Sequence, residues 1–287
     1  MEIAFGVLNH QWFNPKRFNW DLLKKLLVIA VPLFPNFLIY WVFNSCDKVM
    51  ITNMIGIGAA GIYSVGSKLG HASQLIYTAF AGGWQYFAFS TMKEDNQVKS
   101  NSLVFEYLGI ISFVATSFVC AWSYVLFKVL FSEQYLSGYI VAPYLFLAPL
   151  LQMLFQVACN QFIVIKKTWP NMLILSAGAV VNIFINLALI PVLGIEGASI
   201  ATLFGYIVSD IVCVIVLCKM KLMAVSKKFI VSCLAMAAYL LVWRLMFSSN
   251  IIMGTMLAVA LTVTYLVLYS PELKGLIIGL KNRKKTA

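Results

Sequence analysis

A lysine and a histidine stand one helical turn apart in a long apolar stretch, Lys68 and His71 between Tyr63 and Gln85. A charged side chain in hydrocarbon is costly, so such residues usually face the interior of a helix bundle or a water-filled cavity. We therefore ask whether a group in that interior requires the positive charge of this helix. The alternative is that Lys68 snorkels from an interfacial turn and that His71 is an ordinary hydrogen-bonded residue.

Polar residues recur around this pair at helical spacing. With about 100° of rotation per residue they occupy an arc of about 120° on one helix face. The residues of this stripe are Ser64, Ser67, Lys68, His71, Gln74, Thr78, Gly82 and Gln85. A polar stripe of that length indicates a hydrated path through the membrane.

Four further apolar segments repeat this pattern. Their polar residues are Asn36, Tyr40, Asn44, Asp47 and Lys48; Gln152, Gln156 and Asn160; Asn171, Gly178, Asn182 and Asn186; and Thr202, Tyr206, Ser209 and Asp210. We expect five helices to share one polar interior, in which Asp210, nine residues before Lys219, lies well inside the membrane and is a candidate for ion coupling. Two alternatives stay open: amide and hydroxyl groups often join neighbouring helices, and Asp47 with Lys48 could form a local ion pair.

The composition places these segments in a membrane. Of the 287 residues, 62% are hydrophobic and 11% are charged, a balance that a soluble domain of this size cannot hide in one core. The net charge of +11 comes mostly from Lys and Arg in short segments between apolar runs, a pattern that sets membrane topology and does not indicate a nucleic-acid partner. The six cysteines lack metal or redox spacing, so we expect no metal and no cofactor.

Apolar runs long enough to cross a bilayer predict an all-α polytopic membrane protein with about eight transmembrane helices. Their expected limits are Leu26–Ser45, Ala59–Ser90, Leu103–Phe131, Tyr139–Ile165, Pro170–Ile190, Gly197–Cys218, Lys228–Phe247 and Ile251–Tyr269. Most of the 21 Lys and Arg residues lie in alternate connections, and the opposite ones hold only Lys48, Lys128 and Arg244. We expect the last two to be snorkelling anchors. By the positive-inside rule both termini are cytoplasmic.

Residues suited to catalysis are sparse. The adjacent acidic pair Glu94 and Asp95 lies in a short loop, where solvation is the simpler role, and the two histidines are His10 and His71. The sequence offers neither a nucleophile paired with a base nor a glycine-rich phosphate loop. We therefore expect that the protein is not an enzyme, in particular not a membrane glycosyl- or phosphoglycosyl-transferase.

Three stretches in order resemble the Wzx-type polysaccharide flippases of the multidrug/oligosaccharidyl-lipid/polysaccharide exporter superfamily. They are VPLFPNFLIYWVFNSCDKVMI (31–51), GAAGIYSVGSKL (58–69) and NIFINLALIPVLGIEGASIAT (182–202). The resemblance implies a MATE-like fold of two six-helix lobes around a central cavity, sometimes followed by two more helices. This chain looks like the C-terminal lobe, residues 21–223, followed by two helices and a basic tail, residues 224–287. Residues 1–20 would be a cytoplasmic segment or the tail of a missing span.

The same resemblance implies a function and a site. It suggests that the protein moves a polyprenyl-diphosphate-linked oligosaccharide across the bacterial cytoplasmic (inner) membrane, together with a missing N-terminal lobe or as a homodimer, in contact with membrane lipids. Lys68 occupies the position of a cavity-facing basic residue, and Asp47 and Lys48 match an Asp-Arg pair of the family. With the polar stripes, the candidate substrate-binding residues are Asn36, Asn44, Asp47, Lys48, Lys68, His71, Gln74, Gln85, Gln156, Asn182 and Asn186. The main alternative is a cation-coupled multidrug exporter of the same fold, which would use Asp47 and Asp210.

Overall fold

The computed structural model describes residues 19–31, 34–90 and 96–272, and within these ranges it contains helices and no strand. The helices are α2 (Trp20–Ala30), α3 (Phe34–Met54), α4 (Ile57–Gly70), α5 (Ser73–Ser90), α6 (Gln97–Leu130), the 3-10 helix η4 (Glu133–Ile140), α7 (Val141–Val164), α8 (Trp169–Leu193), α9 (Ile195–Lys219), α10 (Lys227–Val242), the π-helical turn η5 (Trp243–Phe247) and α11 (Ile251–Leu268). The prediction of an all-α polytopic membrane protein is confirmed.

Six helical stretches of the described chain are long and apolar enough to cross a membrane. They correspond to the last six predicted spans and begin at Gln97, Glu133, Trp169, Ile195, Lys227 and Ile251. The predicted count of about eight is not confirmed among the described residues.

The first predicted span, Leu26–Ser45, falls on two described helices: α2 ends at Ala30, and α3 runs from Phe34 to Met54. Residues 32 and 33 between them lie outside the described part of the structure. Asp47 and Lys48 lie within α3 and not at the end of a helix.

The second predicted span, Ala59–Ser90, is divided into α4 and α5 at residues His71 and Ala72. The hydroxyl of Ser73 donates a hydrogen bond to the carbonyl of Phe146 in α7, at 2.7 Å, and so fixes the start of α5 against that helix. The polar stripe from Ser64 to Gln85 is thus distributed over two helices.

α7 is the central helix of the bundle. It contacts α4, α5, α6 and α9, and 89% of the most apolar 18-residue segment of this membrane span is buried. Gly66 and Gly70, one turn apart, bring α4 close to this helix: a Cβ atom on Gly70 would lie 2.6 Å from Cβ of Leu145. Small residues at this spacing allow membrane helices to approach closely, and here they set the position of Ser67 and His71.

α8 and α9 form a tight antiparallel pair. The turn between them contains Gly194, whose φ of +62° lies in the left-handed region that glycine adopts without penalty. Gly178 and Gly205 lie at the crossing of the two helices, where a Cβ on Gly178 would be 2.0 Å from Oγ of Ser209. α3 packs against α8 on the other side, so that α3, α4, α7, α8 and α9 surround one region.

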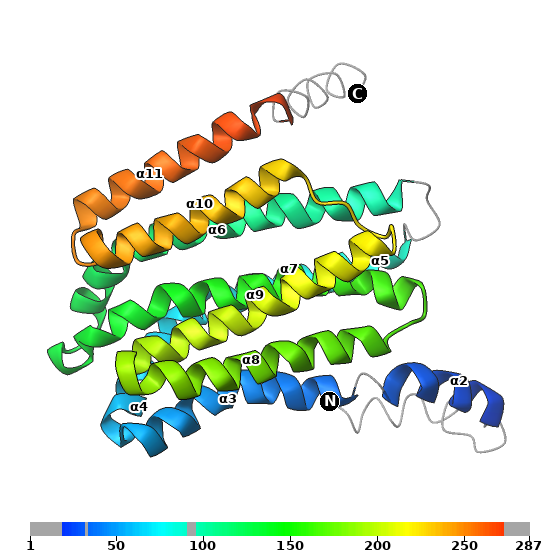
Figure 1. Ribbon diagram of the computed structural model, residues 1–287, viewed down its shortest axis with the longest axis horizontal. Coiled ribbons are helices and arrows are strands. Elements are labelled where there is room, and N and C mark those ends of the chain that lie inside the picture. Colours follow the sequence, from blue (N-terminus) through cyan, green and yellow to red (C-terminus); the bar gives the residue numbers. More distant parts are fainter. Residues whose placement is uncertain (1–18, 32–33, 91–95, 273–287) are drawn as a thin grey trace, which may run out of the picture.

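The last helices, α10, η5 and α11, pack on α6, and α11 lies at the edge of the molecule opposite α3 and α8 (Figure 1). Arg244 of η5 bonds both carboxylate oxygens of Glu196 at the start of α9, with 2.7 Å between Nη2 and Oε2. This pairing corrects the expectation that Arg244 is a snorkelling anchor. Near the opposite end of α10, Ser226 donates hydrogen bonds from its amide and hydroxyl to Glu106 of α6.

Candidate functional site

Asp47 is the centre of a buried polar cluster that joins four helices. Its side chain projects from α3, and the residue is only 2% exposed. The hydroxyl of Tyr63 in α4 donates a hydrogen bond to Oδ2 at 2.6 Å, and the hydroxyl of Thr202 in α9 donates a second one to the same oxygen. The amide of Asn186 in α8 donates to Oδ1 at 2.8 Å. Three donors from three helices thus converge on one carboxyl group.

A second layer of hydrogen bonds orients these donors. Asn182 lies one turn before Asn186 on α8, and its side-chain oxygen accepts a hydrogen bond from the Asn186 amide at 3.3 Å. The amide of Asn182 in turn donates to Oγ1 of Thr202 at 3.3 Å. Both asparagines are fully buried, so the cluster stabilises the contact between α8 and α9 as well as the position of Asp47.

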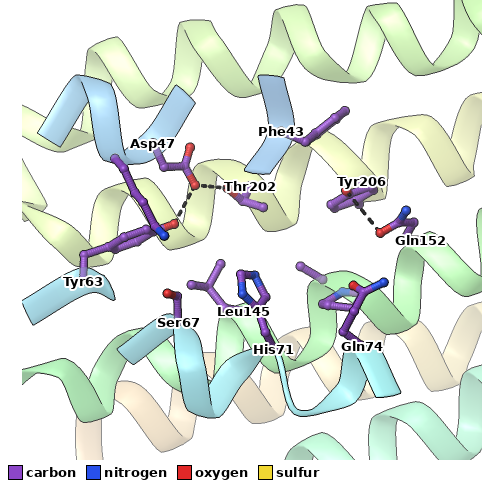
Figure 2. Close-up of a pocket in the computed structure, with 13 residues that line it drawn as sticks. Phe43, Asp47, Tyr63, Ser67, His71, Gln74, Leu145, Gln152, Thr202 and Tyr206 are labelled. Carbon is purple, nitrogen blue, oxygen red and sulfur yellow. Dashed lines mark hydrogen bonds between the residues drawn. The ribbon is translucent and has the colours of Figure 1, made fainter. Parts of the chain in front are cut away.

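A small pocket opens beside the cluster. It is lined by polar residues of α3, α4, α7 and α9, and of the α4–α5 junction, and by several apolar side chains; the polar members are Asp47, Lys48, Tyr63, Ser67, His71, Gln74, Gln152, Thr202 and Tyr206. Figure 2 shows His71 and Gln74 on one wall and Asp47 and Tyr206 on the facing wall. The cavity volume is about 20 Å³, which is room for roughly one water molecule. In this packing the pocket is therefore closed to any larger ligand.

An aromatic pair forms one end of the pocket. The rings of Phe43 and Tyr206 are stacked with 4.4 Å between their centroids, and the hydroxyl of Tyr206 lies 3.5 Å from Oε1 of Gln152 on α7. Phe43 approaches Gly205 closely, since a Cβ at that position would lie 2.6 Å from its ring. Separation of this pair is the simplest way to lengthen the pocket along α9.

The chemistry of the cluster suits a proton or a small hard cation better than a transition metal. Carboxylate, amide and hydroxyl oxygens are ligands of such cations, although here each Asp47 oxygen already accepts a hydrogen bond. Among the residues that the structure describes, no group of three or more His, Cys, Asp or Glu side chains is placed to hold a metal ion.

The structure brings several predicted site residues together and leaves others apart. Asp47, Lys48, His71 and Gln74 line the pocket, and Asn182 and Asn186 lie in the hydrogen-bonded layer behind it. The local ion pair considered for Asp47 and Lys48 is not formed: Asp47 is bonded to the donors described above, and Lys48 is exposed.

The remaining candidates do not line the pocket. Gln85 is exposed on α5, Gln156 is half-buried on α7, and Asp210 is buried on α9 one turn beyond Tyr206. The side chains of Asn36 and Asn44 lie outside the described part of the structure.

Lys68 is exposed on α4, next to the pocket-lining Ser67, and does not itself line the pocket. Its position follows from the packing of α4, whose buried residues Tyr63, Gly66, Ser67 and Gly70 face α7 and the Asp47 cluster. No hydrogen bond or ion pair joins Lys68 to another described residue. The ammonium group is therefore available to a ligand or partner.

Tyr63 and Thr202 bond Asp47 directly but were not among the candidate residues for the site. Tyr63 stands four and eight residues before Ser67 and His71, and therefore on the same helix face, so the period of the stripe could have included it. Thr202 was recognised as part of a polar stripe, but its contact with Asp47 spans 155 residues of sequence. Only the fold shows that contact.

Comparison with known proteins now bears on this site. Residues 1–139 match a family model described as "Polysaccharide biosynthesis protein". The predicted resemblance to this family is confirmed. The matched segment includes Asp47, Lys48, Tyr63, Lys68, His71 and Gln74, and thus supplies residues on both walls of the pocket, whereas Thr202 and the two asparagines lie beyond it. No curated protein matches the chain.

Among solved structures, a MOP superfamily transporter from Pyrococcus furiosus is similar to this chain with a TM-score of 0.48 and 14% sequence identity. The similarity covers 85% of this chain and 65% of that transporter.

Proposed function

We propose that this chain forms one lobe of a flippase that moves a lipid-diphosphate-linked oligosaccharide across the bacterial cytoplasmic membrane, with both termini in the cytoplasm. The observation that carries the proposal is a small polar pocket between the helices of an apolar bundle, about half of whose lining comes from the segment that matches the polysaccharide biosynthesis family. Transporters commonly place their sites between helices near the middle of the membrane.

Two lysines and several hydrogen-bond donors at or beside the pocket support an anionic ligand. Lys48 lies on α3 beside Asp47, His71 lies at the junction of α4 and α5, and both line the pocket. Lys68 adds an exposed ammonium one residue from the pocket wall. A diphosphate in a low-dielectric site needs cations or several hydrogen-bond donors in place of its water shell. Lys48, Lys68, His71 and the amide of Gln74 can supply such charges or hydrogen-bond donors.

The size of the pocket supports a second lobe or a second copy. A volume of about 20 Å³ cannot admit a sugar, so the substrate would bind where this lobe faces its partner, and the exposed side of α4 with Lys68 is our candidate for that face. In this proposal residues 21–223 form the lobe and residues 224–287 the additional helices. Residues 1–20 then precede the lobe on its cytoplasmic side.

Substitution of Lys68 tests the role of its charge. In cells that lack their own flippase, the chain is expressed with a matching first lobe, and export of the glycan is measured. We expect export to decrease in the order Lys, Arg, Met, Glu, because Lys68→Met keeps most of the apolar stem and removes the ammonium. A loss of about 1.4 to 2.8 kcal/mol of binding to the rate-limiting state corresponds to a ten- to hundred-fold decrease.

Lys128→Met is the matched control, because Lys128 is also an exposed lysine but lies at the end of α6 and does not line the pocket. It should export as the unaltered protein does. Wild-type export by correctly inserted Lys68→Met would refute the diphosphate role. Full export by the chain alone would mean that it works as a homodimer.

Single-cysteine labelling tests the orientation. Cysteines placed at Gly194 and Ser249 should react with an impermeant thiol reagent added from outside, and those at Asn96 and Trp169 should not. The reverse pattern would invert the proposed topology.

A multidrug exporter of the same fold is the second candidate, and the buried carboxyl groups of Asp47 and Asp210 favour it. In that case the chain with its first lobe would confer drug resistance without restoring the glycan.

A further inference from the structure

Asp210 is a buried carboxyl group without a hydrogen-bond donor among the described residues. The residue is 8% exposed, and neither side-chain oxygen has a hydrogen-bond partner among the described residues. It lies nine residues before Lys219, about 13 Å from the end of α9 at 1.5 Å per residue, and thus in the interior of the bilayer. Buried polar groups are almost always hydrogen-bonded, so an exception at this depth requires an explanation.

The titratable groups near Asp210 in the described part of the chain carry no positive charge. They are Tyr40 of α3, Cys159 of α7, Tyr206 and Cys213 of α9 and, from α10, Cys233. α8, which packs against the same turn of α9, has no titratable residue in its sequence. An ionised carboxylate here would be both desolvated and unpaired, at a cost of several kcal/mol. The neutral acid avoids that cost.

Asp47 provides the contrast within the same bundle. It receives three hydrogen bonds and borders the pocket. Hydrogen bonds of this kind stabilise the negative charge of a carboxylate. Thr202, which bonds Asp47, and Asp210 are eight residues apart on α9, or about 12 Å along its axis. Tyr206, stacked on Phe43, lies between them and lines the pocket. If α9 moves away from α3 at this pair, pocket water reaches Asp210.

We propose that Asp210 is a proton-binding site of the transport cycle. In the closed packing it is the carboxylic acid. When α3 and α9 separate, its O–H bond breaks, the proton passes to water in the opened pocket, and a hydrated carboxylate remains; closure requires that the proton return. The role in transport rests on the proposed function and deepens it, because it names the proton as the coupled ion.

Infrared difference spectroscopy of the full chain in lipid bilayers tests both parts. The spectrum of the unaltered protein minus that of Asp210→Asn should contain, at neutral pH, the C=O band of a protonated carboxylic acid. Transfer to D2O should shift this band, because a proton that is released and rebound exchanges with solvent. Asp210→Glu, which keeps a carboxyl group, should displace the band without abolishing it, and it serves if the asparagine variant does not fold. Asp47→Asn is the matched control and should retain the Asp210 band.

Two results would overturn the proposal. Carboxylate bands in place of the acid band would mean that Asp210 is ionised and paired. An acid band that never shifts in D2O would mean a permanently protonated structural residue. Neither measurement needs the substrate, so a negative result here is independent of the Lys68 export test. A negative export test, in turn, would not contradict proton binding at Asp210.

Discussion

Removal of one hydrogen-bond donor from Asp47 should cost more than removal of an equivalent donor elsewhere in the bundle. Tyr63→Phe deletes only the hydroxyl that donates to Oδ2 of Asp47 at 2.6 Å. The ring is 3% exposed and keeps its packing, so no cavity forms. The change in the free energy of unfolding therefore reports the hydrogen bond itself.

The magnitude follows from the charge on the acceptor. Hydrogen bonds between membrane helices average about 0.6 kcal/mol, with a maximum of about 1.7, whereas bonds to charged groups contribute about 1.5–3 kcal/mol. Three donors converge on Asp47, an arrangement that favours the carboxylate, so we place this bond at the upper end of the membrane range and expect about 1.5 kcal/mol. This equals about a tenfold change in the equilibrium constant of unfolding.

Tyr239→Phe is the matched control. The hydroxyl of Tyr239 donates to the backbone carbonyl of Ser117 at 2.7 Å, and the residue is 4% exposed, so the geometry and burial are similar but the acceptor is neutral. We expect a cost of about 0.6 kcal/mol for this variant. Reversible unfolding in mixed micelles, followed by circular dichroism, measures both values.

A double-mutant cycle with Asp47→Asn then isolates the pair. The effect of Tyr63→Phe should largely disappear in the Asp47→Asn background, because the charged acceptor is gone. Equal costs for Tyr63→Phe and Tyr239→Phe, or a coupling energy near zero, would refute the argument that the Asp47 cluster is held together by a charged acceptor.

Three further predictions concern packing and pH. Gly178→Ala should destabilise the fold by about 1–3 kcal/mol, because its methyl group would lie 2.0 Å from a serine hydroxyl of α9; an unchanged unfolding midpoint would show that the helices can separate at no cost. Arg244→Met should loosen α10 and α11 from α9, since it leaves the carboxylate of Glu196 buried without its partner, and proteolysis of these helices should become faster than in Arg244→Lys. The Lys228 ammonium hydrogen-bonded to Glu272 lowers the pKa of that carboxyl. Its contribution, at most about 1 kcal/mol for an exposed pair, is present above the unfolded pKa of about 4.3 and is lost as pH falls through the lower folded value. Hydrogen exchange at the end of α11 should then accelerate on acidification, and this pH dependence should be absent in Glu272→Gln.

The sequence alone determined the class of protein and most of its helices. Apolar length and the distribution of Lys and Arg act locally, since each span must satisfy its own backbone in lipid, and six predicted spans correspond to the six membrane-length helices of the described structure. Helical periodicity also indicated that Asp47, His71 and Gln74 share a polar interior. These inferences succeeded because they need only the spacing of residues along one helix.

The division of the second predicted span and the partners of each buried carboxyl were decided by tertiary structure. The break at His71 depends on the contacts of Gly70 and Ser73 with α7, which lies more than 70 residues away in sequence. The sequence likewise contained two intramembrane aspartates, Asp47 and Asp210, and gave no reason to prefer one of them as a functional residue. Only the packing of α4, α8 and α9 gives Asp47 three donors and leaves Asp210 with none among the described residues. The physical reason is that a buried carboxyl group obtains its hydrogen-bond donors from neighbouring helices. Periodicity predicts the direction in which a side chain points but not the residues that it contacts.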